Sequence, residues 1–223
     1  MLEALHEFPE WNVIVADNGS RDRTRRVARA GGATVITEFR RGYGAACLAG
    51  IASLQDRPDD DIVVFLDADG SDDPAVLPAL IDAVRRGADL ALGSRTLARA
   101  EAGSLTLTQR VGNALACTLI RAFWRTRYSD LAPCRAVRLG ALRALRMTDR
   151  DYGWTVQMQV RAARSGLRTE EIPSPYRCRR HGRSKVSGSL SGSVRAGITI
   201  LRVIADELRD SLRATGPAIV TPD

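Results

Sequence analysis

Short β-rich segments alternate with helical segments over the first 93 residues, and this alternation constrains the fold more than any other feature of the sequence. The expected strands are residues 11–16, 33–37, 61–66 and 88–92, and the expected helices are 22–30, 42–54 and 75–86. Such alternation is typical of a mostly parallel sheet with helices on both faces. Residues 61–66 (DIVVFL) are almost entirely apolar, which predicts a strand buried on both faces.

Composition narrows the classes of protein to consider. The chain has 223 residues, 44% apolar and 26% charged, which suits one soluble domain with a packed core. A net charge of +7 predicts anionic partners, and with only 5% aromatic residues for base stacking we expect no nucleic-acid partner. The cysteines are too scattered for a zinc site or a disulfide framework. Neither a leader nor an apolar stretch of about 18 residues is visible, which favours a cytoplasmic protein.

Residues suited to ligand binding follow each of the four expected strands. Acids, glycines or an arginine occupy residues 17–20, 38–44, 67–73 and 93–95. In open α/β sheets, ligands bind outside the carboxyl ends of the parallel strands. We therefore expect the functional site at this edge of the sheet.

Asp67 and Asp69 directly follow the apolar 61–66 run. Two carboxylates at a strand end can converge on one hard cation, which in turn neutralises a diphosphate. The alternative is a polar turn before the next helix, and for Asp73, which precedes Pro74, an N-cap is the better interpretation. For Asp67 and Asp69 we favour binding of a metal ion and a nucleotide.

Two glycine-containing turns allow either a local or a functional interpretation. Residues 17–24 (DNGSRDRT) can form an Asx turn and a helix cap, or Asp17 can hydrogen-bond a base or a ribose. Residues 40–44 (RRGYG) can form an anion-binding nest at a helix N-terminus, or their glycines can serve close packing. Neither turn has the pattern of a P-loop or of a G-x-G-x-x-G motif.

Taken in order, six motifs make the chain similar to glycosyltransferase family 2, close to its dolichol-phosphate mannosyltransferase-like branch. They are DNGSRDRT (17–24), RRGYGAACLAG (40–50), FLDADGSDDP (65–74), GSR (93–95), DYGWTVQMQVRAARSGL (151–167) and GRSKVSG (182–188). The resemblance implies a Rossmann-like GT-A fold. It also implies transfer of a sugar from a UDP- or GDP-sugar, with Mg²⁺ or Mn²⁺, to a polyprenyl phosphate or another anionic acceptor.

The same resemblance implies roles for individual residues. The nucleotide would contact Asp17, Gly19, Ser20, Gly42, Tyr43, Gly44, Ala45 and Asp67. Asp67 and Asp69 would hold the metal, and catalysis would involve Asp69, Arg95, Asp151 and Gln157. The acceptor or its phosphate would meet Arg95, Trp154, Arg179, Arg180, Arg183, Ser184 and Lys185. Trp154 can instead belong to the core, and the basic residues from 179 to 185 can be a solvated loop.

Gln157 departs from the family pattern, which usually has an acid at this point of the Gly-Trp-x-Val-Glu motif. An amide cannot act as the general base that a hydroxyl acceptor requires. A phosphate acceptor is already mostly ionised at neutral pH, since its second pKa is about 6. Gln157 therefore favours a polyprenyl-phosphate acceptor, unless Asp130, Asp149 or Asp151 supplies a base.

The opening of the chain departs from the family as well. The family begins with a central strand, whereas residues 1–10 are typical of the end of the helix that follows it. A sheet without an internal strand has unpaired N–H and C=O groups on both neighbours, each costing about 1–3 kcal/mol when buried. We expect an N-terminally truncated GT-A sheet and favour a reading frame that starts upstream over a degraded relative.

The expected organisation is a GT-A domain over 1–189, with a nucleotide-binding half (1–95) and an acceptor half (96–189). A C-terminal amphipathic helix (190–213) and a flexible tail (214–223) follow. The apolar stripe and the arginines of the helix suit docking at the cytoplasmic face of a membrane, although core packing or a dimer gives the same stripe. The alternative function is a non-catalytic or weakly active nucleotide-sugar binder.

Overall fold

The computed structural model describes residues 2–5, 7–178 and 190–214. The elements in chain order are α1 (Leu2–Leu5), β1 (Ile14–Asp17), α2 (Thr24–Ala30), β2 (Thr34–Thr37), α3 (Tyr43–Ala52), β3 (Ile62–Phe65), a 3₁₀ turn (Pro74–Val76), α4 (Leu77–Arg85), β4 (Leu90–Ser94), α5 (Leu107–Trp124), β5 (Arg135–Arg138), α6 (Leu139–Ala144), α7 (Trp154–Arg164), β6 (Thr169–Pro173) and α8 (Leu190–Ala214). The strand–helix alternation predicted for the first half is confirmed.

Within the described residues, the strands form two sheets rather than one. The smaller sheet pairs β1 with β2 in parallel, and the larger has the order β3–β5–β4–β6. In the larger sheet β3, β4 and β6 run in one direction, and β5 lies antiparallel between β3 and β4. The expected α/β architecture with a mostly parallel sheet is confirmed, with one reversed strand in its interior.

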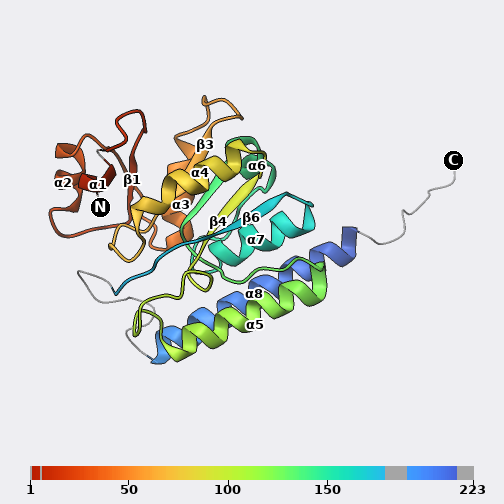
Figure 1. Cartoon of the computed structure of the whole chain (residues 1–223). Coiled ribbons are helices and arrows are strands. Elements are labelled where there is room, and N and C mark those ends of the chain that lie inside the picture. Colours follow the sequence, from red (N-terminus) through yellow and green to blue (C-terminus); the bar gives the residue numbers. More distant parts are fainter. Residues whose placement is uncertain (1, 6, 179–189, 215–223) are drawn as a thin grey trace, which may run out of the picture.

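Alternating residues of the larger sheet pack against different helices, as the period of two along a strand requires. One core contains Leu90 and Leu92 together with side chains of α3, α5, α7 and α8. The other contains Ala91 of the same strand and the apolar side of α4. The sheet is therefore covered on both faces, with α4 on one side and α5, α7 and α8 on the other (Figure 1).

A cavity of about 2020 Å³ separates the two sheets. It is lined by residues of both β1 and β3, including Ile14, Val15, Ile62 and Val64, and by Leu5 of α1. No described strand lies between β1 and β3, so each has hydrogen-bonded ladder partners on one side only. This gap lies where the sequence led us to expect a missing internal strand.

The burial expected for the 61–66 run is wrong for this reason. All four residues of β3 are partly exposed, because the strand borders the cavity. The fully buried strand is instead β4, which has neighbours on both sides.

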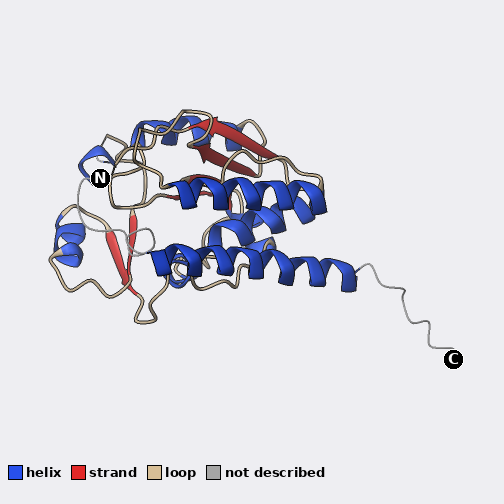
Figure 2. Cartoon of the chain, turned by 90° about the horizontal axis from the view of Figure 1, so that it is seen from below, coloured by secondary structure: helices blue, strands red, loops and turns tan. Residues whose placement is uncertain are grey.

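Helices α5 and α8 lie side by side and form one outer face of the molecule (Figure 2). Glu207 of α8 is 3% exposed and pairs with Arg161 and Arg164 of α7, while Trp124 of α5 donates to the hydroxyl of Ser211. These contacts fix α8 against the domain. In the part of the chain that the structure describes, no helix combines the length and apolar content needed to cross a membrane.

Candidate active site

The carboxyl ends of β3 and β4 bring acidic and basic residues to one edge of the larger sheet. Because these strands run in the same direction, Asp67 and Arg95 leave the sheet at the same edge. The hydroxyl of Tyr43, at the start of α3, lies near the carboxylate of Asp67. Burial, and next the charge of Asp67, raise the pKa of Tyr43 well above its ordinary value, so the phenol stays protonated.

Asp69 and Asp73 occupy the turn that follows Asp67. The carboxylate of Asp69 accepts hydrogen bonds from the hydroxyl of Ser71 and, at 2.9 Å, from its backbone N–H. Asp73 accepts from the N–H of Ala75 at 3.1 Å and is the N-cap of the 3₁₀ turn, as predicted.

Asp72 is a buried carboxyl group that the sequence analysis did not single out. It is 2% exposed, and neither side-chain oxygen has a hydrogen bond within the described residues. Burial, and next the charge of Asp67, raise the pKa of Asp72 to about 7, against an opposing effect of Arg95. A further ionisable carboxyl group therefore lies close to Asp67 and Asp69.

This set of carboxyl groups fits a divalent cation. Carboxylate oxygens are the hard ligands that Mg²⁺ and Mn²⁺ prefer, and the Asp72 oxygens near Asp67 and Asp69 have no hydrogen-bond partner among the described residues. In the described ranges, no three His, Cys, Asp or Glu side chains converge closely enough to hold a metal ion by themselves. Substrate or water oxygens would complete the coordination.

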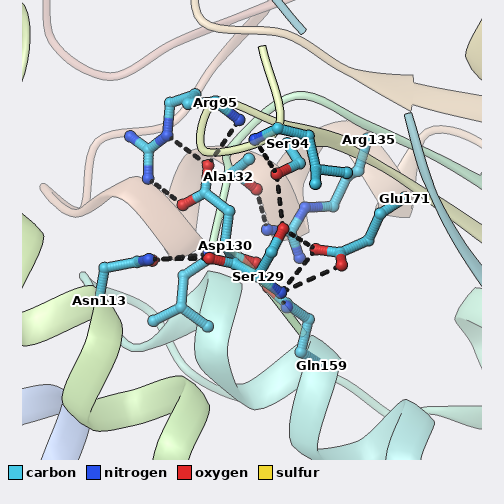
Figure 3. Close-up of polar contacts among 11 residues, drawn as sticks. Ser94, Arg95, Asn113, Ser129, Asp130, Ala132, Arg135, Gln159 and Glu171 are labelled. Atoms are coloured by element: carbon cyan, nitrogen blue, oxygen red, sulfur yellow. Dashed lines mark hydrogen bonds and ion pairs between the residues drawn. The ribbon is translucent and has the colours of Figure 1, made fainter. Parts of the chain in front are cut away.

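Arg95 is held in a bidentate ion pair with Asp130, 35 residues later in the chain (Figure 3). Its Nε and Nη2 donate to the two carboxylate oxygens of Asp130 at 2.8 and 2.7 Å. Because both oxygens are engaged by a cation, Asp130 is poorly suited to be the general base that the sequence analysis left open.

The segment after β6 crosses the site toward the basic stretch. Tyr176 forms an isolated antiparallel bridge with Asp72, and the N–H of Arg177 donates to the carbonyl of Ser71 at 2.9 Å. The guanidinium of Arg95 lies over the ring of Tyr176, 5.1 Å from its centroid. The predicted phosphate ligands Arg179, Arg180, Arg183, Ser184 and Lys185 lie outside the described residues, which resume at Leu190.

Gly42 and Gly44 serve close packing, the alternative to an anion nest. A Cβ on either residue would overlap the backbone of the 149–151 segment. The N–H groups of Gly44 and Ala45 donate to the carbonyls of Asp151 and Arg150, at 3.3 and 2.9 Å. The N–H groups of Gly44 and Ala45 are therefore engaged by protein carbonyls, and contact of residues 42–45 with a nucleotide stays a prediction.

The turn after β1 takes the local form that the sequence allowed. Asp17 is 2% exposed, accepts from the N–H of Ser20 at 3.3 Å, and lies 3.7 Å from Nε of Arg25. Gly19 has a φ of +77°, which favours glycine. Asn18 bonds the 38–42 segment on three backbone groups. The turn is thus an Asx-type turn tied to the start of α3.

Two predicted site residues belong to the structural core instead. Trp154 is fully buried and packs against Phe65, so it is not a platform for a sugar. The Gln157 side chain accepts from the N–H groups of Thr148 and Asp149, and its amide donates to Glu207. Its amide is therefore committed to joining α7, the 148–149 segment and α8. Asp151 is exposed beside the start of α3.

The family model described as Glycosyl transferase family 2 matches residues 1–146. The chain belongs to this family. An uncharacterized glycosyltransferase of Mycobacterium tuberculosis (strain ATCC 25618 / H37Rv) is 39% identical over 196 residues, which cover 87% of each chain. An undecaprenyl-phosphate mannosyltransferase of Micrococcus luteus is 32% identical over 201 residues, covering 86% of this chain and 82% of the relative.

A solved structure of glucosyl-3-phosphoglycerate synthase from Mycobacterium tuberculosis, in complex with Mn²⁺, UDP and glucosyl-3-phosphoglycerate, has a similar fold. It gives a TM-score of 0.70 at 19% identity, over 93% of this chain and 74% of that one. The family 2 glycosyltransferase described here therefore has the expected GT-A fold.

The sequence did not reveal the roles of three charged residues of this glycosyltransferase. Asp72 was not assigned a role of its own, and Arg135 was not considered although its guanidinium is fully buried. Arg135 donates to the carbonyls of Ala132, Pro133 and Thr155. Asp130 was considered only as a base. In the sequence, a charged residue among apolar neighbours indicates that the side chain is buried. It does not indicate which residue that side chain will bind.

Proposed function

We propose that this chain transfers a sugar from a nucleotide-diphosphate donor to a polyprenyl phosphate or a similar anionic acceptor, with Mg²⁺ or Mn²⁺. The observation that carries the proposal is the gathering of Asp67, Asp69, Asp72 and Arg95 at the carboxyl edge of the larger sheet. The names of curated relatives, among them the undecaprenyl-phosphate mannosyltransferase of Micrococcus luteus, support this choice of acceptor.

In this proposal Asp67-Ala68-Asp69 is a DXD motif that holds the metal ion. The bound ion would offset the charge of the diphosphate as it leaves. Ser71 donates to Asp69, so this carboxylate is oriented before any ligand binds. The proposed nucleotide contacts are the exposed parts of the turns at 17–20 and 42–45, together with Asp67.

An anionic phosphate acceptor matches the base-free chemistry of the site. Gln157 is an amide, and the carboxylate of Asp130 is bound by Arg95. A phosphate oxygen that is already ionised needs no proton removed, whereas a hydroxyl does. Arg95, with Arg179, Arg180, Arg183, Ser184 and Lys185 from the adjoining stretch, would meet phosphate oxygens. Asp149 and Asp151 are the remaining candidate bases for a hydroxyl acceptor.

A lipid acceptor requires access to a membrane surface, and we assign this role to the face formed by α5 and α8. Leu107, Val111 and Leu115 follow one another at intervals of four residues on α5 and are 77%, 59% and 44% exposed. Ile198 and Leu201 of α8 are also exposed. Arg110 of α5 and Arg202 of α8 are exposed as well, and their charges suit anionic headgroups. The protein would then act at the cytoplasmic face of the membrane, with residues 1–95 as donor half and 96–189 as acceptor half.

The decisive experiment separates binding from turnover. Thermal shift with UDP-, GDP- and other nucleotide-sugars, each with Mn²⁺, with Mg²⁺ or with EDTA, identifies the donor as the one that stabilises the chain only with metal. Transfer to a short-chain polyprenyl phosphate is then measured with that donor. We expect Asp69→Ala to abolish transfer, whereas Asp73→Asn, which retains an N-cap side chain, should keep it. Metal-independent transfer, or full activity of Asp69→Ala, would refute the proposal.

A non-catalytic or weakly active nucleotide-sugar binder is the second candidate. It is favoured by one observation: the turn at Asp17 belongs to a sheet that is separated from β3 by the cavity. Metal-dependent stabilisation by a nucleotide-sugar without detectable transfer to any lipid phosphate would select this candidate.

A further inference from the structure

We propose that Asp130 is a positioning residue of the transfer site, which holds the Arg95 guanidinium in the one orientation that serves a phosphate group. The inference rests on the proposed function, because it assigns Arg95 to a phosphate. Asp130 itself would touch no substrate: its carboxylate is only 2% exposed and lies behind the guanidinium.

Three hydrogen bonds fix Arg95 relative to Asp130. The backbone N–H and Nε of Arg95 both donate to Oδ2 of Asp130 at 2.8 Å, and Nη2 donates to Oδ1 at 2.7 Å. Because the backbone and the side chain bind the same carboxylate, the guanidinium cannot rotate without breaking this set. Within the described residues Nη1 makes no hydrogen bond and is left for a ligand.

The backbone that carries the Asp130 side chain is itself fixed from three other elements, as Figure 3 shows. Asn113 of α5 binds the carbonyl of Ser129 and the N–H of Leu131, on either side of Asp130. Gln159 of α7 donates to the carbonyl of Asp130 at 2.9 Å, and Glu171 of β6 accepts from the N–H of Ser129. With its neighbouring backbone groups bonded in this way, the loop cannot shift to follow a displaced arginine.

The surroundings of Arg95 point its charge toward the carboxyl groups of the site. Burial alone would lower the pKa of Arg95, but its hydrogen bonds and attraction to Asp130 raise it above the ordinary value, and Tyr176 and Asp72 add to this. The guanidinium lies over the ring of Tyr176, whose backbone bridges to Asp72. Arg95 is therefore a permanent cation held between the Asp130 loop and the acidic turn, where a phosphate would be attracted.

The test is a double-mutant cycle on Arg95 and Asp130, measured as kcat/KM for transfer. A misdirected catalytic group typically costs about 100-fold, so we expect Arg95→Ala and Asp130→Asn each to lose roughly 10- to 100-fold. The double variant should lie within about twofold of Arg95→Ala, because Asp130 acts only through that side chain. Additive losses would overturn the proposal.

Chemical rescue distinguishes positioning from a purely structural role. Added guanidinium ion should raise the transfer activity of Arg95→Ala by at least about tenfold, because Asp130 is present to bind it. It should not raise the activity of Arg95→Ala/Asp130→Asn. Asn113→Ala is the matched control: it removes two bonds to the same loop but leaves the carboxylate, so rescue of Arg95→Ala/Asn113→Ala should persist. Rescue that is independent of Asp130 would overturn the proposal.

Two further arms keep the test decisive. If Asp130→Asn does not fold, Asp130→Glu keeps the charge and displaces the carboxylate by one methylene; undiminished transfer in that variant would overturn the proposal. Binding of inorganic pyrophosphate with Mg²⁺ tests the phosphate contact without depending on glycosyl transfer. This ligand should raise the melting temperature of the wild type more than that of Asp130→Asn or Arg95→Ala. Equal shifts in all three would overturn it, whereas absence of transfer with the expected shifts would refute only the proposed function.

Discussion

The backbone of Gly44, at the start of α3, lies directly against the carbonyl of Asp149, more than 100 residues later in the chain. A Cβ at position 44 would overlap that carbonyl. The glycine of a motif that suggests phosphate binding is thus needed because two segments approach each other closely.

This contact predicts that Gly44→Ala is destabilising. The backbone atoms that it meets cannot move as a side chain would, so we expect a loss of about 1–3 kcal/mol in chemical denaturation. Gly50→Ala in the same helix is the matched control, because a Cβ there meets nothing within 4 Å. It should be neutral or stabilise by up to about 1 kcal/mol. Equal effects of the two substitutions would contradict the packing role.

Asp72 predicts a dependence of stability on pH. Its pKa is raised from 3.8 in the unfolded chain to about 7 in the fold. Its protonated form is therefore favoured by folding, and that stabilisation is complete below pH 4 and lost as the pH rises through 7. Asp72→Asn mimics the neutral form, so in EDTA it should be more stable than the wild type at pH 8 by on the order of 1–4 kcal/mol, and the difference should shrink at pH 5.

Equilibrium unfolding of both proteins across this pH range checks the prediction. Asp82→Asn, an exposed acid on α4, serves as the control and should follow the wild type. A difference between Asp72→Asn and the wild type that does not change with pH would contradict the raised pKa of Asp72.

The cavity between the sheets predicts uneven hydrogen exchange. Strands β1 and β3 have ladder partners on one side, whereas β4 is paired on both and is fully buried. Amides of β1 and β3 that face the cavity should exchange through local opening, and those of β4 only through global unfolding. Amide exchange measured by mass spectrometry should therefore protect β4 by several orders of magnitude more. Equal protection of the three strands would mean that another segment fills the cavity in solution.

Glu207 predicts how α8 is held on the domain. Removing one partner of a buried ion pair costs about 3–5 kcal/mol, and Glu207→Ala would leave Arg161 and Arg164 without their carboxylate. The neighbouring Asp206 pairs on the surface with Arg209, so Asp206→Ala should cost no more than about 1 kcal/mol. Thermal and urea denaturation would measure both, and similar losses would contradict the assignment.

The exposed apolar side chains of α5 predict binding to lipid. Replacing Leu107, Val111 and Leu115 with serine should reduce partitioning onto vesicles rich in phosphatidylglycerol by on the order of tenfold or more, because each buried apolar side chain contributes about 1.5–3 kcal/mol. Val27→Ser, an equally exposed apolar site on α2, should not change partitioning. Sedimentation with vesicles measures this, and unchanged binding of the triple variant would refute the proposed membrane face.

The sequence predicted those features that depend on residues close together in the chain. The strand–helix alternation followed from local periodicity, and the N-cap at Asp73 followed from its position before Pro74. The acidic turn after β3 was predictable because chain direction alone places the ends of parallel strands at one edge.

Only the tertiary structure decided which of these groups are engaged and by what. Gln157 and Asp130 are chemically able to join a reaction, but the first is bonded to the 148–149 backbone and Glu207, and the second to Arg95, 35 residues away. Trp154 has the same sequence context whether it stacks on a sugar or packs in a core. Local sequence sets backbone preference and chemical type, but the partners of a buried side chain come from distant segments, and the packing of those segments determines its role.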